Sequence, residues 1–274
     1  MSIPSSAPAA HTIAGSAGDS FLATPDLELQ RRFGGLQRLY GTAGAALIAR
    51  AHVAVVGIGG VGSWAAEALA RSGVGRLTLI DMDHVAPSNI NRQIHAVTDT
   101  VGQAKVLAMQ ERIGAIHPGC QVLAVDDFVT PENWPDLLPC GVDAVIDACD
   151  QLQAKLAMAQ WARRQRALFI SVGAAGGKRL AHKVDIDDLA HTTHDPLLAQ
   201  LRYRLRKHHN APRDGKKIGV TCVFSREAVA GPDASCQLPA SDGSLNCSGY
   251  GSVVAVTATF GQCAAGWVLD RLAM

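Results

Sequence analysis

The feature that most constrains this chain is a glycine-rich turn inside VAVVGIGGVGSWAAEALARSG, residues 53–73. An apolar run leads into Gly57, Gly59, Gly60 and Gly62, and an amphipathic segment follows them. A strand that ends in such a turn and continues as a helix directs unpaired N–H groups and the positive end of the helix dipole toward a phosphate. The turn therefore predicts a nucleotide-binding α/β unit, and by itself it fits NAD and ATP equally well.

Apolar strand-like and amphipathic helix-like segments alternate along the next part of the chain. The predicted strands are 53–57, 76–83, 120–128, 142–150 and 167–173, and the predicted helices are 61–72, 102–116 and 151–165. Such βαβ units predict a Rossmann-like, doubly wound, mostly parallel sheet of the α/β class. The pattern then loosens into strands at 182–189 and 215–225, a basic helix at 195–209 and a long loop at 229–250. This region predicts a C-terminal, partly antiparallel extension.

Composition indicates how the chain divides into domains and in which cellular compartment we expect it. Residues 1–28 are rich in Ser, Ala and Pro, which predicts a flexible tail before a single domain at 29–274. We expect its nucleotide half at about 51–173 and a substrate or dimer half at about 174–274. Seven cysteines without a CxxC pair, and an N-terminus without a signal-peptide pattern, indicate a cytoplasmic protein.

The charge balance and an apolar segment near the C-terminus limit the kinds of partner that we expect the protein to bind. The 25 Lys and Arg residues nearly balance 24 Asp and Glu residues, which excludes a globally basic nucleic-acid binder but not a local basic patch. The apolar segment 252–269 is nearly long enough to span a bilayer, yet its Thr, Gln and Gly residues favour a buried packing helix. A membrane partner is therefore not expected.

The residues beyond the second predicted strand separate the two kinds of nucleotide. Asp81 lies 19 residues after Gly62, where a carboxylate accepts hydrogen bonds from a ribose. A dense polar group follows it, made up of Asp83, Ser88, Asn89, Asn91, Arg92 and Gln93, with Lys105 at the start of the next helix. Hydride transfer does not require such a group, whereas attack on an α-phosphate builds charge on phosphate oxygens and on departing pyrophosphate.

Three side chains, those of Arg92, Lys105 and Asp150, are predicted to be catalytic. Arg92 and Lys105 can neutralise the charge that develops on the phosphates, and Asn89 can orient a phosphate or a ribose. Asp150, at the end of the strand predicted at 142–150, is suited to hold a Mg²⁺ ion that bridges the phosphates. Taken singly, Arg92 and Lys105 also fit a solvated loop and a helix-start lysine, but together with Asp150 they favour ATP.

Several of these segments resemble one family of enzymes. Residues 32–41, 55–83, 88–93, 101–106 and 147–150 are similar to the ubiquitin-activating-type adenylyltransferases, the ThiF/MoeB/HesA superfamily. Within it, residues 60–71, 91–96, 126–133, 219–225 and 257–261 resemble the tRNA threonylcarbamoyladenosine dehydratase branch. The likeness runs from about residue 31 to the C-terminus.

The resemblance implies a reaction and a set of roles. The glycine loop would cradle ATP and Asp81 would bind its ribose, while Asn89, Arg92, Lys105 and Asp150 would handle phosphates and Mg²⁺. In the dehydratase branch the carboxylate of a threonylcarbamoyl group on a tRNA adenosine is adenylated. An atom of its own side group then attacks it, closing a ring and releasing AMP. Dimers are usual in the family, so the resemblance also implies a homodimer.

The chain departs from the superfamily pattern at its cysteines. Members that activate sulfur carriers usually carry two CxxC pairs for Zn²⁺, which are missing here, so we expect ATP and Mg²⁺ without zinc. Cys236, in the long loop, is a candidate reactive thiol, whereas Cys222 fits an apolar core and Cys247 is undecided. GAAGG at 173–177 either helps to bind a monovalent cation or turns the chain.

Three functions remain open at this point. The first is ATP-dependent dehydration of modified tRNA, and the second is adenylation of the C-terminus of a ubiquitin-like sulfur carrier. The third is a non-catalytic partner in a sulfur-transfer system with a cysteine desulfurase. In some members of the superfamily an N-terminal arginine reaches the partner subunit's ATP, and Arg32 and Arg38 are both candidates for that part.

A basic stretch at 202–217 is the predicted contact with tRNA phosphates. It contains Arg202, Arg204, Arg206, Lys207, Arg213, Lys216 and Lys217 against the single acid Asp214. A substrate with dense phosphate requires a cationic surface, and no other stretch of the chain is as basic. The alternative is a solvated helix end followed by a basic loop.

Overall fold

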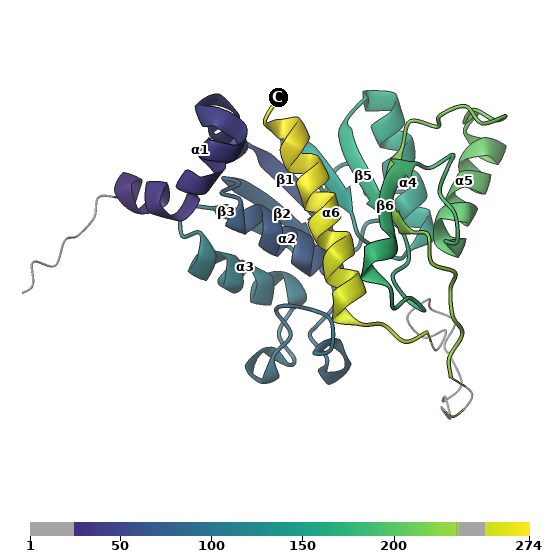
Figure 1. The fold of residues 1–274 in the computed structure, drawn as a ribbon, viewed down its shortest axis with the longest axis horizontal. Helices are drawn as coiled ribbons and strands as arrows, with labels where there is room; N and C mark the ends of the chain where they lie inside the picture. The colour runs from purple at the N-terminus through teal and green to yellow at the C-terminus, as the bar shows by residue number, and fades with distance from the viewer. Residues whose placement is uncertain (1–24, 234, 236–249) are drawn as a thin grey trace, which may run out of the picture.

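One twisted sheet organises the molecule (Figure 1). The structure is a computed structural model that describes residues 25–233, 235 and 250–274. The strands are β1 (His52–Val56), β2 (Arg76–Ile80), β3 (Gln121–Val125), β4 (Ala144–Asp147), β5 (Leu168–Val172), β6 (Val184–Asp188) and β7 (Thr221–Ser225). Their order is β3-β2-β1-β4-β5-β7-β6. The strand order thus changes direction between β1 and β4. Sheets of this kind bind ligands in a crevice at the carboxyl ends of the strands on either side of such a point.

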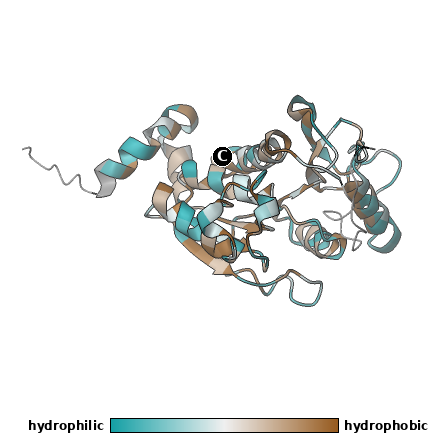
Figure 2. Ribbon diagram, turned by 90° about the horizontal axis from the view of Figure 1, so that it is seen from below, coloured by the Kyte–Doolittle hydropathy of each residue, from teal (hydrophilic) through white to brown (hydrophobic). Residues whose placement is uncertain are grey.

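Helices cover both faces of the sheet. They are α1 (Pro25–Arg50), α2 (Gly62–Arg71), α3 (Lys105–Ile116), α4 (Leu152–Gln165), α5 (Pro196–His208) and α6 (Val254–Leu272), with short 3₁₀ turns at Pro87–Asn89, Thr98–Thr100 and Ala181–Lys183. Helices α2, α3 and α6 lie on one face around Leu69, Met109 and Phe260. Helices α4 and α5 cover the other around Met158 and Leu201. Figure 2 shows hydrophobic residues concentrated in the strands between these two layers.

The predicted α/β class and the mostly parallel sheet are confirmed. All neighbouring strands pair in parallel except β6 and β7. Because β7 is parallel to β5, only β6 supplies the antiparallel edge. Several predicted strands are too long: β2 ends at Ile80, so Asp81 and Asp83 follow it, and β4 ends at Asp147, which leaves Asp150 three residues beyond the sheet.

Helix α1 was not predicted from the sequence. It begins at Pro25, so residues 25–28, which were assigned to the tail, are helical, while residues 1–24 lie outside the described part of the chain. The helix bends at Gly41, where φ is +72°. Tertiary contacts fasten it: the Phe33 ring lies 4.7 Å from the ring of His117, and the Tyr40 hydroxyl donates a hydrogen bond of 3.1 Å to Asp270.

The C-terminal apolar segment is a buried helix, as expected. Phe260, Ala264 and Val268 of α6 are fully buried. A Cβ at Gly261 would lie 2.5 Å from the Val61 carbonyl oxygen, so this glycine lets α6 approach the start of α2 closely. Among the described residues, no helix is long and apolar enough to cross a membrane.

Candidate adenylation site

Two glycines of the predicted loop are required by packing alone. Gly57 follows β1 with φ of +85°, and a Cβ there would lie 2.8 Å from the backbone nitrogen of Cys149. A Cβ on Gly62, the first residue of α2, would lie 1.8 Å from the carbonyl oxygen of Gly57. These contacts hold the loop tightly between β1 and α2, so that the first turn of the helix opens at the edge of the sheet.

Gly59 differs from these two glycines, because packing does not require a glycine there. No described protein atom lies within 4 Å of a Cβ built on Gly59, and its φ is not in the left-handed region. Packing therefore does not exclude a side chain at this position. Open space beside main-chain N–H groups at a helix N-terminus is the arrangement that lets a phosphate approach. Gly60, by contrast, packs against the Arg92 side chain, since its Cβ would lie 3.2 Å from Cγ and Cδ of that residue.

Asp81 joins the glycine loop to the residues beyond β2. Its carboxylate accepts a hydrogen bond of 2.6 Å from the Ile58 N–H and one of 2.8 Å from the Asp83 N–H. Burial raises the pKa of Asp81 above its usual range, against the opposing effects of Lys105 and of the two N–H donors. The carboxylate is thus fixed beside the loop at the end of β2, where a nucleotide ribose binds in folds of this kind.

Lys105, which the sequence predicts to neutralise phosphate charge, lies beside this carboxylate. Its Nζ is 2.6 Å from Asp83 Oδ2 and 4.0 Å from Asp81 Oδ1, and its side chain is 7% exposed. The Lys105 N–H also donates to the Asp83 carbonyl, which fixes the start of α3 against the polar turn. A nearly buried ammonium close to a phosphate-binding loop can neutralise charge on phosphate oxygens without much screening by water.

Arg92 reaches the glycine loop from the turn at 87–93. Its Nη1 donates to the Ser88 carbonyl at 2.8 Å and to Asn91 Oδ1 at 3.0 Å, while its carbonyl accepts from Trp64 Nε1 at 2.9 Å. Burial lowers the pKa of Arg92 from its usual value, but an arginine stays charged at neutral pH. The guanidinium is therefore held by the Ser88 carbonyl and the Asn91 side chain, while the aliphatic part of Arg92 lies beside Gly60.

The other polar residues of this turn have local partners. Asn89 Oδ1 accepts from the Ala86 N–H at 3.0 Å and so caps the 3₁₀ turn, and Asn91 Nδ2 donates to the Ser252 carbonyl at 3.0 Å. Ser88 contributes its carbonyl to Arg92. These bonds shape the turn, and direct contact of Ser88, Asn89 and Asn91 with a nucleotide stays a prediction.

Asp150 lies at the same edge of the sheet. It is exposed, and it follows Cys149, whose backbone packs against Gly57. The turn after β4 thus places Asp150 directly after a residue that packs against the glycine loop. Mg²⁺ in nucleotide sites is usually bound by one or two carboxylates together with phosphate oxygens, and this donor set fits that pattern.

Sequence reasoning overlooked two polar residues close to these groups. Ser63 Oγ and both ring nitrogens of His95 are buried and, like the predicted Gln93 Oε1, have no hydrogen-bond partner among the described residues. Burial, together with the charges of Lys105 and Arg112, lowers the pKa of His95 to about 4, so its ring is neutral. Ser63 directly follows the last glycine of the loop, which is the only sequence signal that points to it.

The predicted tRNA contacts gather around α5. A hollow of about 410 Å³ is lined by Ala199, Arg202, Tyr203, Arg206, Lys207 and Arg213. The Tyr203 ring is 60% exposed, with the Lys207 ammonium 5.5 Å from its centre. Lys216 and Lys217 are exposed on the following loop, whereas Arg204 is half-buried and does not line the hollow.

Not every cation of this hollow is available to a ligand. Arg202 Nη1 donates to the carbonyls of Leu189 and Thr192 and to Thr192 Oγ1, and Arg206 Nε donates to the Pro212 carbonyl at 3.1 Å. Both arginines therefore also support the fold. Lys207 and Arg213 are the exposed cations of the hollow, although Arg213 Nη2 also donates to the Arg206 carbonyl at 3.4 Å.

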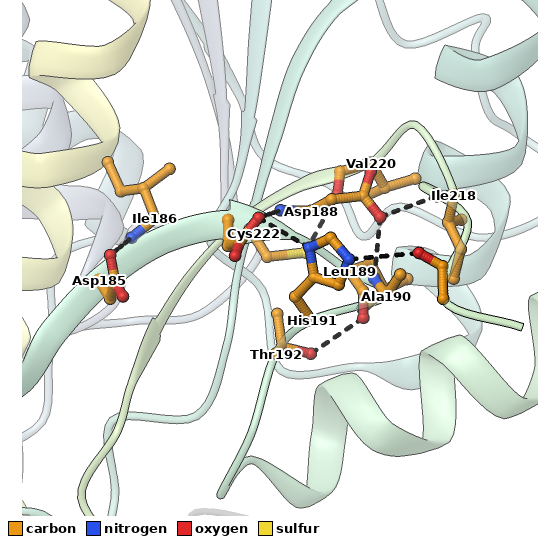
Figure 3. Close-up of polar contacts among 12 residues, drawn as sticks. Asp185, Ile186, Asp188, Leu189, Ala190, His191, Thr192, Ile218, Val220 and Cys222 are labelled. Carbon is orange, nitrogen blue, oxygen red and sulfur yellow. Dashed lines mark hydrogen bonds and ion pairs between the residues drawn. The ribbon is translucent and has the colours of Figure 1, made fainter.

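The loop that carries the last basic residues is fastened to the end of β6 (Figure 3). Asp188 accepts hydrogen bonds from the N–H groups of Ile218 and Gly219 at 2.8 and 2.7 Å. His191 Nδ1 lies 3.1 Å from Asp187 Oδ1, and its Nε2 lies 3.4 Å from the Gly215 carbonyl oxygen. The hydrogen bond to Asp187 and the bond to Gly215 raise the pKa of His191. These contacts give the basic loop a defined place beside α5.

The cysteines divide into two groups. Cys222 is fully buried in β7, and burial raises the pKa of its thiol well above the usual value, which fits the expected core role. Cys236 and Cys247 lie outside the described residues, so a reactive thiol at Cys236 stays a prediction.

Comparison with known proteins agrees with this geometry. The profile described as ThiF family matches residues 30–273. The chain is 47% identical over 251 residues to the tRNA threonylcarbamoyladenosine dehydratase of Escherichia coli, covering 89% of this chain and 94% of that one. It is 43% identical over 247 residues to the dehydratase of Haemophilus influenzae, with the same coverage.

A solved structure gives the same result in three dimensions. The crystal structure of the Escherichia coli dehydratase in complex with ATP has a TM-score of 0.81 and 46% sequence identity, and the match covers 89% of this chain and 94% of that one. The match thus includes both the sheet and the helices around the glycine loop. From the loop, the surrounding charges and these likenesses together, it follows that the chain belongs to the ThiF family.

Proposed function

We propose that this protein uses ATP to dehydrate the threonylcarbamoyl group of a modified adenosine in tRNA. The observation that carries the proposal is the open space at Gly59, in a loop that Arg92 contacts at Gly60 and Asp81 contacts at Ile58, with Lys105 beside Asp81. The relatives named as tRNA threonylcarbamoyladenosine dehydratases match this chain over nearly their whole length, which supports the same reaction.

The first step is attack of the substrate carboxylate on the α-phosphorus of ATP. A bond forms between a carboxylate oxygen and phosphorus, and the bond from phosphorus to pyrophosphate breaks. Lys105 and Arg92 act by electrostatic stabilisation, because negative charge grows on the phosphate oxygens and on the leaving group. Asp81 holds the ribose, and Asp150 is the residue suited to hold Mg²⁺, which supplies further charge neutralisation when it is bound.

The second step closes a ring within the substrate. An atom of the side group attacks the activated carbonyl carbon and gives up its proton, while the bond to AMP breaks. AMP leaves far more easily than hydroxide, and an intramolecular attack gains mainly from correct positioning. The protein is therefore required to bind and orient the substrate, and a covalent enzyme intermediate is unnecessary.

Incubation with ATP and either total tRNA or a ubiquitin-like sulfur carrier tests this function, with AMP release as the measurement. The proposal predicts AMP release that depends on tRNA carrying the threonylcarbamoyl group. Release that depends on the carrier instead would replace tRNA with a protein substrate. ATP binding without AMP release in either mixture would favour a non-catalytic role in a sulfur-transfer system.

The cationic hollow on α5 is the proposed contact with tRNA phosphates. We expect Lys207→Ala/Arg213→Ala to weaken tRNA binding while ATP binding is unchanged. Each lost phosphate contact lowers the slope of log affinity against log salt concentration by about 0.7–0.9. Filter binding of tRNA over a salt series measures this slope. The charge-matched control Arg50→Ala/Lys183→Ala removes two exposed cations elsewhere and retains the slope; equal slopes in both variants would place the RNA on another surface.

Cys236 is expected to be dispensable for the dehydration. Because ring closure uses an atom of the substrate, a Cys236→Ser enzyme retains product formation from ATP and modified tRNA. Mass spectrometry of digested tRNA detects the loss of water from the modified nucleoside. A folded Cys236→Ser protein that forms no product would support a thioester or persulfide step instead.

The homodimer implied by the resemblance also belongs to this proposal. Leu39 of α1 is 73% exposed and Met274 is 93% exposed, and α1 packs against α6 near the C-terminus. Both arginines are exposed, but Arg32 donates to the Ile116 carbonyl of its own chain at 2.8 Å and pairs with Glu28 at 2.6 Å. Of the two candidate arginines, Arg38 is thus the better placed to reach a partner subunit, and light scattering of wild type and Leu39→Glu tests the dimer.

A further inference from the structure

A buried polar network lies directly beneath the candidate adenylation site. Asp147 ends β4, Ser171 is its direct neighbour in β5, and Lys155 lies in the second turn of α4. All three side chains are 0% exposed. Lys155 Nζ lies 2.9 Å from Asp147 Oδ2, and Ser171 Oγ donates to the same oxygen at 2.6 Å. No part of the proposed reaction uses these groups directly.

The network fixes the main chain just beyond β4. The other oxygen of Asp147 accepts from the Cys149 N–H at 3.3 Å and from the Cys149 thiol at 3.1 Å. Burial alone would lower the pKa of Lys155, but the Asp147 carboxylate outweighs that effect and raises it, so the lysine is charged. Every acceptor position of the carboxylate that faces the protein is therefore used, and the turn from Asp147 to Cys149 has little freedom to move.

The glycine loop rests on this turn. The Ala148 N–H donates to the Val56 carbonyl at 2.8 Å, and a Cβ on Gly57 would lie 2.8 Å from the Cys149 nitrogen. A Cβ on Gly62 would lie 3.3 Å from Cβ of Ala148. Both packing glycines thus contact residues 148–149, and Asp150 is the next residue along the chain. A shift of this turn would move the phosphate-binding loop and Asp150 together.

Stability alone does not explain a buried ion pair at this position. Removing two charges from water costs several kcal/mol per ion, and apolar residues of similar volume are often as stable or more so. We propose that Asp147, Lys155 and Ser171 form a positioning network that sets the glycine loop and Asp150 for Mg·ATP. This inference rests on the proposed function, because it concerns the same nucleotide site.

The test compares ATP binding with and without Mg²⁺ by calorimetry, so it needs no tRNA and no turnover. The double variant Asp147→Asn/Lys155→Met removes both charges and leaves none buried without a partner. We expect a stability close to that of the wild type and a loss of about 10–100-fold in affinity for Mg·ATP, as for residues that orient the ligands of a metal site. The affinity for ATP measured in EDTA, without Mg²⁺, should fall by a smaller factor.

Three comparisons separate positioning from simple misfolding. A partly unfolded sample lowers the number of binding sites but not the dissociation constant, whereas a displaced site raises the dissociation constant. Ser171→Ala retains both charges and folds even if the double variant does not, and we expect it to weaken Mg·ATP binding by a smaller factor. Glu67→Gln neutralises another buried carboxylate, which pairs with Arg71 and Arg112, and should leave the affinity unchanged.

Each outcome of these binding measurements leads to a different conclusion. Wild-type affinity for Mg·ATP in the folded double variant, or in Ser171→Ala if the double variant does not fold, would overturn the network's role. Loss of affinity in Glu67→Gln to the same degree would also overturn it, since any buried ion pair would then suffice. Failure of the wild type itself to bind ATP would instead reject the proposed function.

Discussion

Gly59→Ala is expected to abolish ATP binding in a protein that folds normally, while Gly62→Ala is expected to prevent normal folding. At Gly59 an added Cβ meets no described protein atom and projects into the space that a phosphate would occupy. At Gly62 the same Cβ would lie 1.8 Å from the Gly57 carbonyl oxygen, so the start of α2 must move away from β1. Overpacking typically costs about 1–3 kcal/mol of unfolding free energy, and more where the backbone cannot relax.

Thermal unfolding and calorimetric titration with ATP separate these two effects. For Gly59→Ala we expect a change in unfolding free energy within about 0.5 kcal/mol, the range of substitutions that touch nothing. Gly114→Ala, in α3, is a matched control, because its Cβ also meets no atom within 4 Å and lies away from the loop. Undiminished ATP affinity in Gly59→Ala would mean that no phosphate approaches this residue.

Lys105→Ala, Arg92→Ala and Asp150→Ala are each expected to slow AMP formation by about 10²–10³-fold, the usual effect of losing one well-placed charge-stabilising group. Lys105 and Arg92 are held by the polar turn beyond β2, and Asp150 approaches from β4. On the proposed function, the three side chains therefore act on one bound nucleotide from two different turns.

AMP release at saturating ATP and modified tRNA measures the loss. Arg50→Ala, which removes an exposed cation just before β1, at the opposite edge of the sheet, is the matched control and should retain the wild-type rate. Circular dichroism establishes that each variant is folded. Rates within a few-fold of wild type for all three variants would reject the assignment of this edge of the sheet as the adenylation site.

Local sequence patterns predicted much of the fold and of the site. The apolar runs and the glycine spacing identified β1, α2 and β2, because strand and helix periods and tight turns depend on residues close together in sequence. The position of Asp81 and Lys105 after consecutive elements of one βαβ unit was sufficient to expect them at a single edge. These expectations required no knowledge of how distant strands pair.

Helix α1 shows where such patterns fail. Four glycines, Gly34, Gly35, Gly41 and Gly44, lie within it, and each disfavours a helix in isolation. The helix forms because its residues pack on distant elements: Phe33 contacts His117, and Gly44 lets the chain approach Ala273 closely. A sequence window that contains α1 alone holds none of this information.

The sequence by itself determined the βαβ unit with its glycine loop, and it named the charged residues that are proposed to serve this unit and the basic stretch on α5. Only the tertiary structure decided that Asp147, rather than Asp150, is the buried acid, since its partners Lys155 and Ser171 come from α4 and β5. It also decided that Arg202 and Arg206 are partly committed to main-chain carbonyls, which leaves Lys207 and Arg213 exposed. The physical reason is that burial and hydrogen-bond partners arise from contacts between residues far apart in the chain, and a local pattern does not record those contacts.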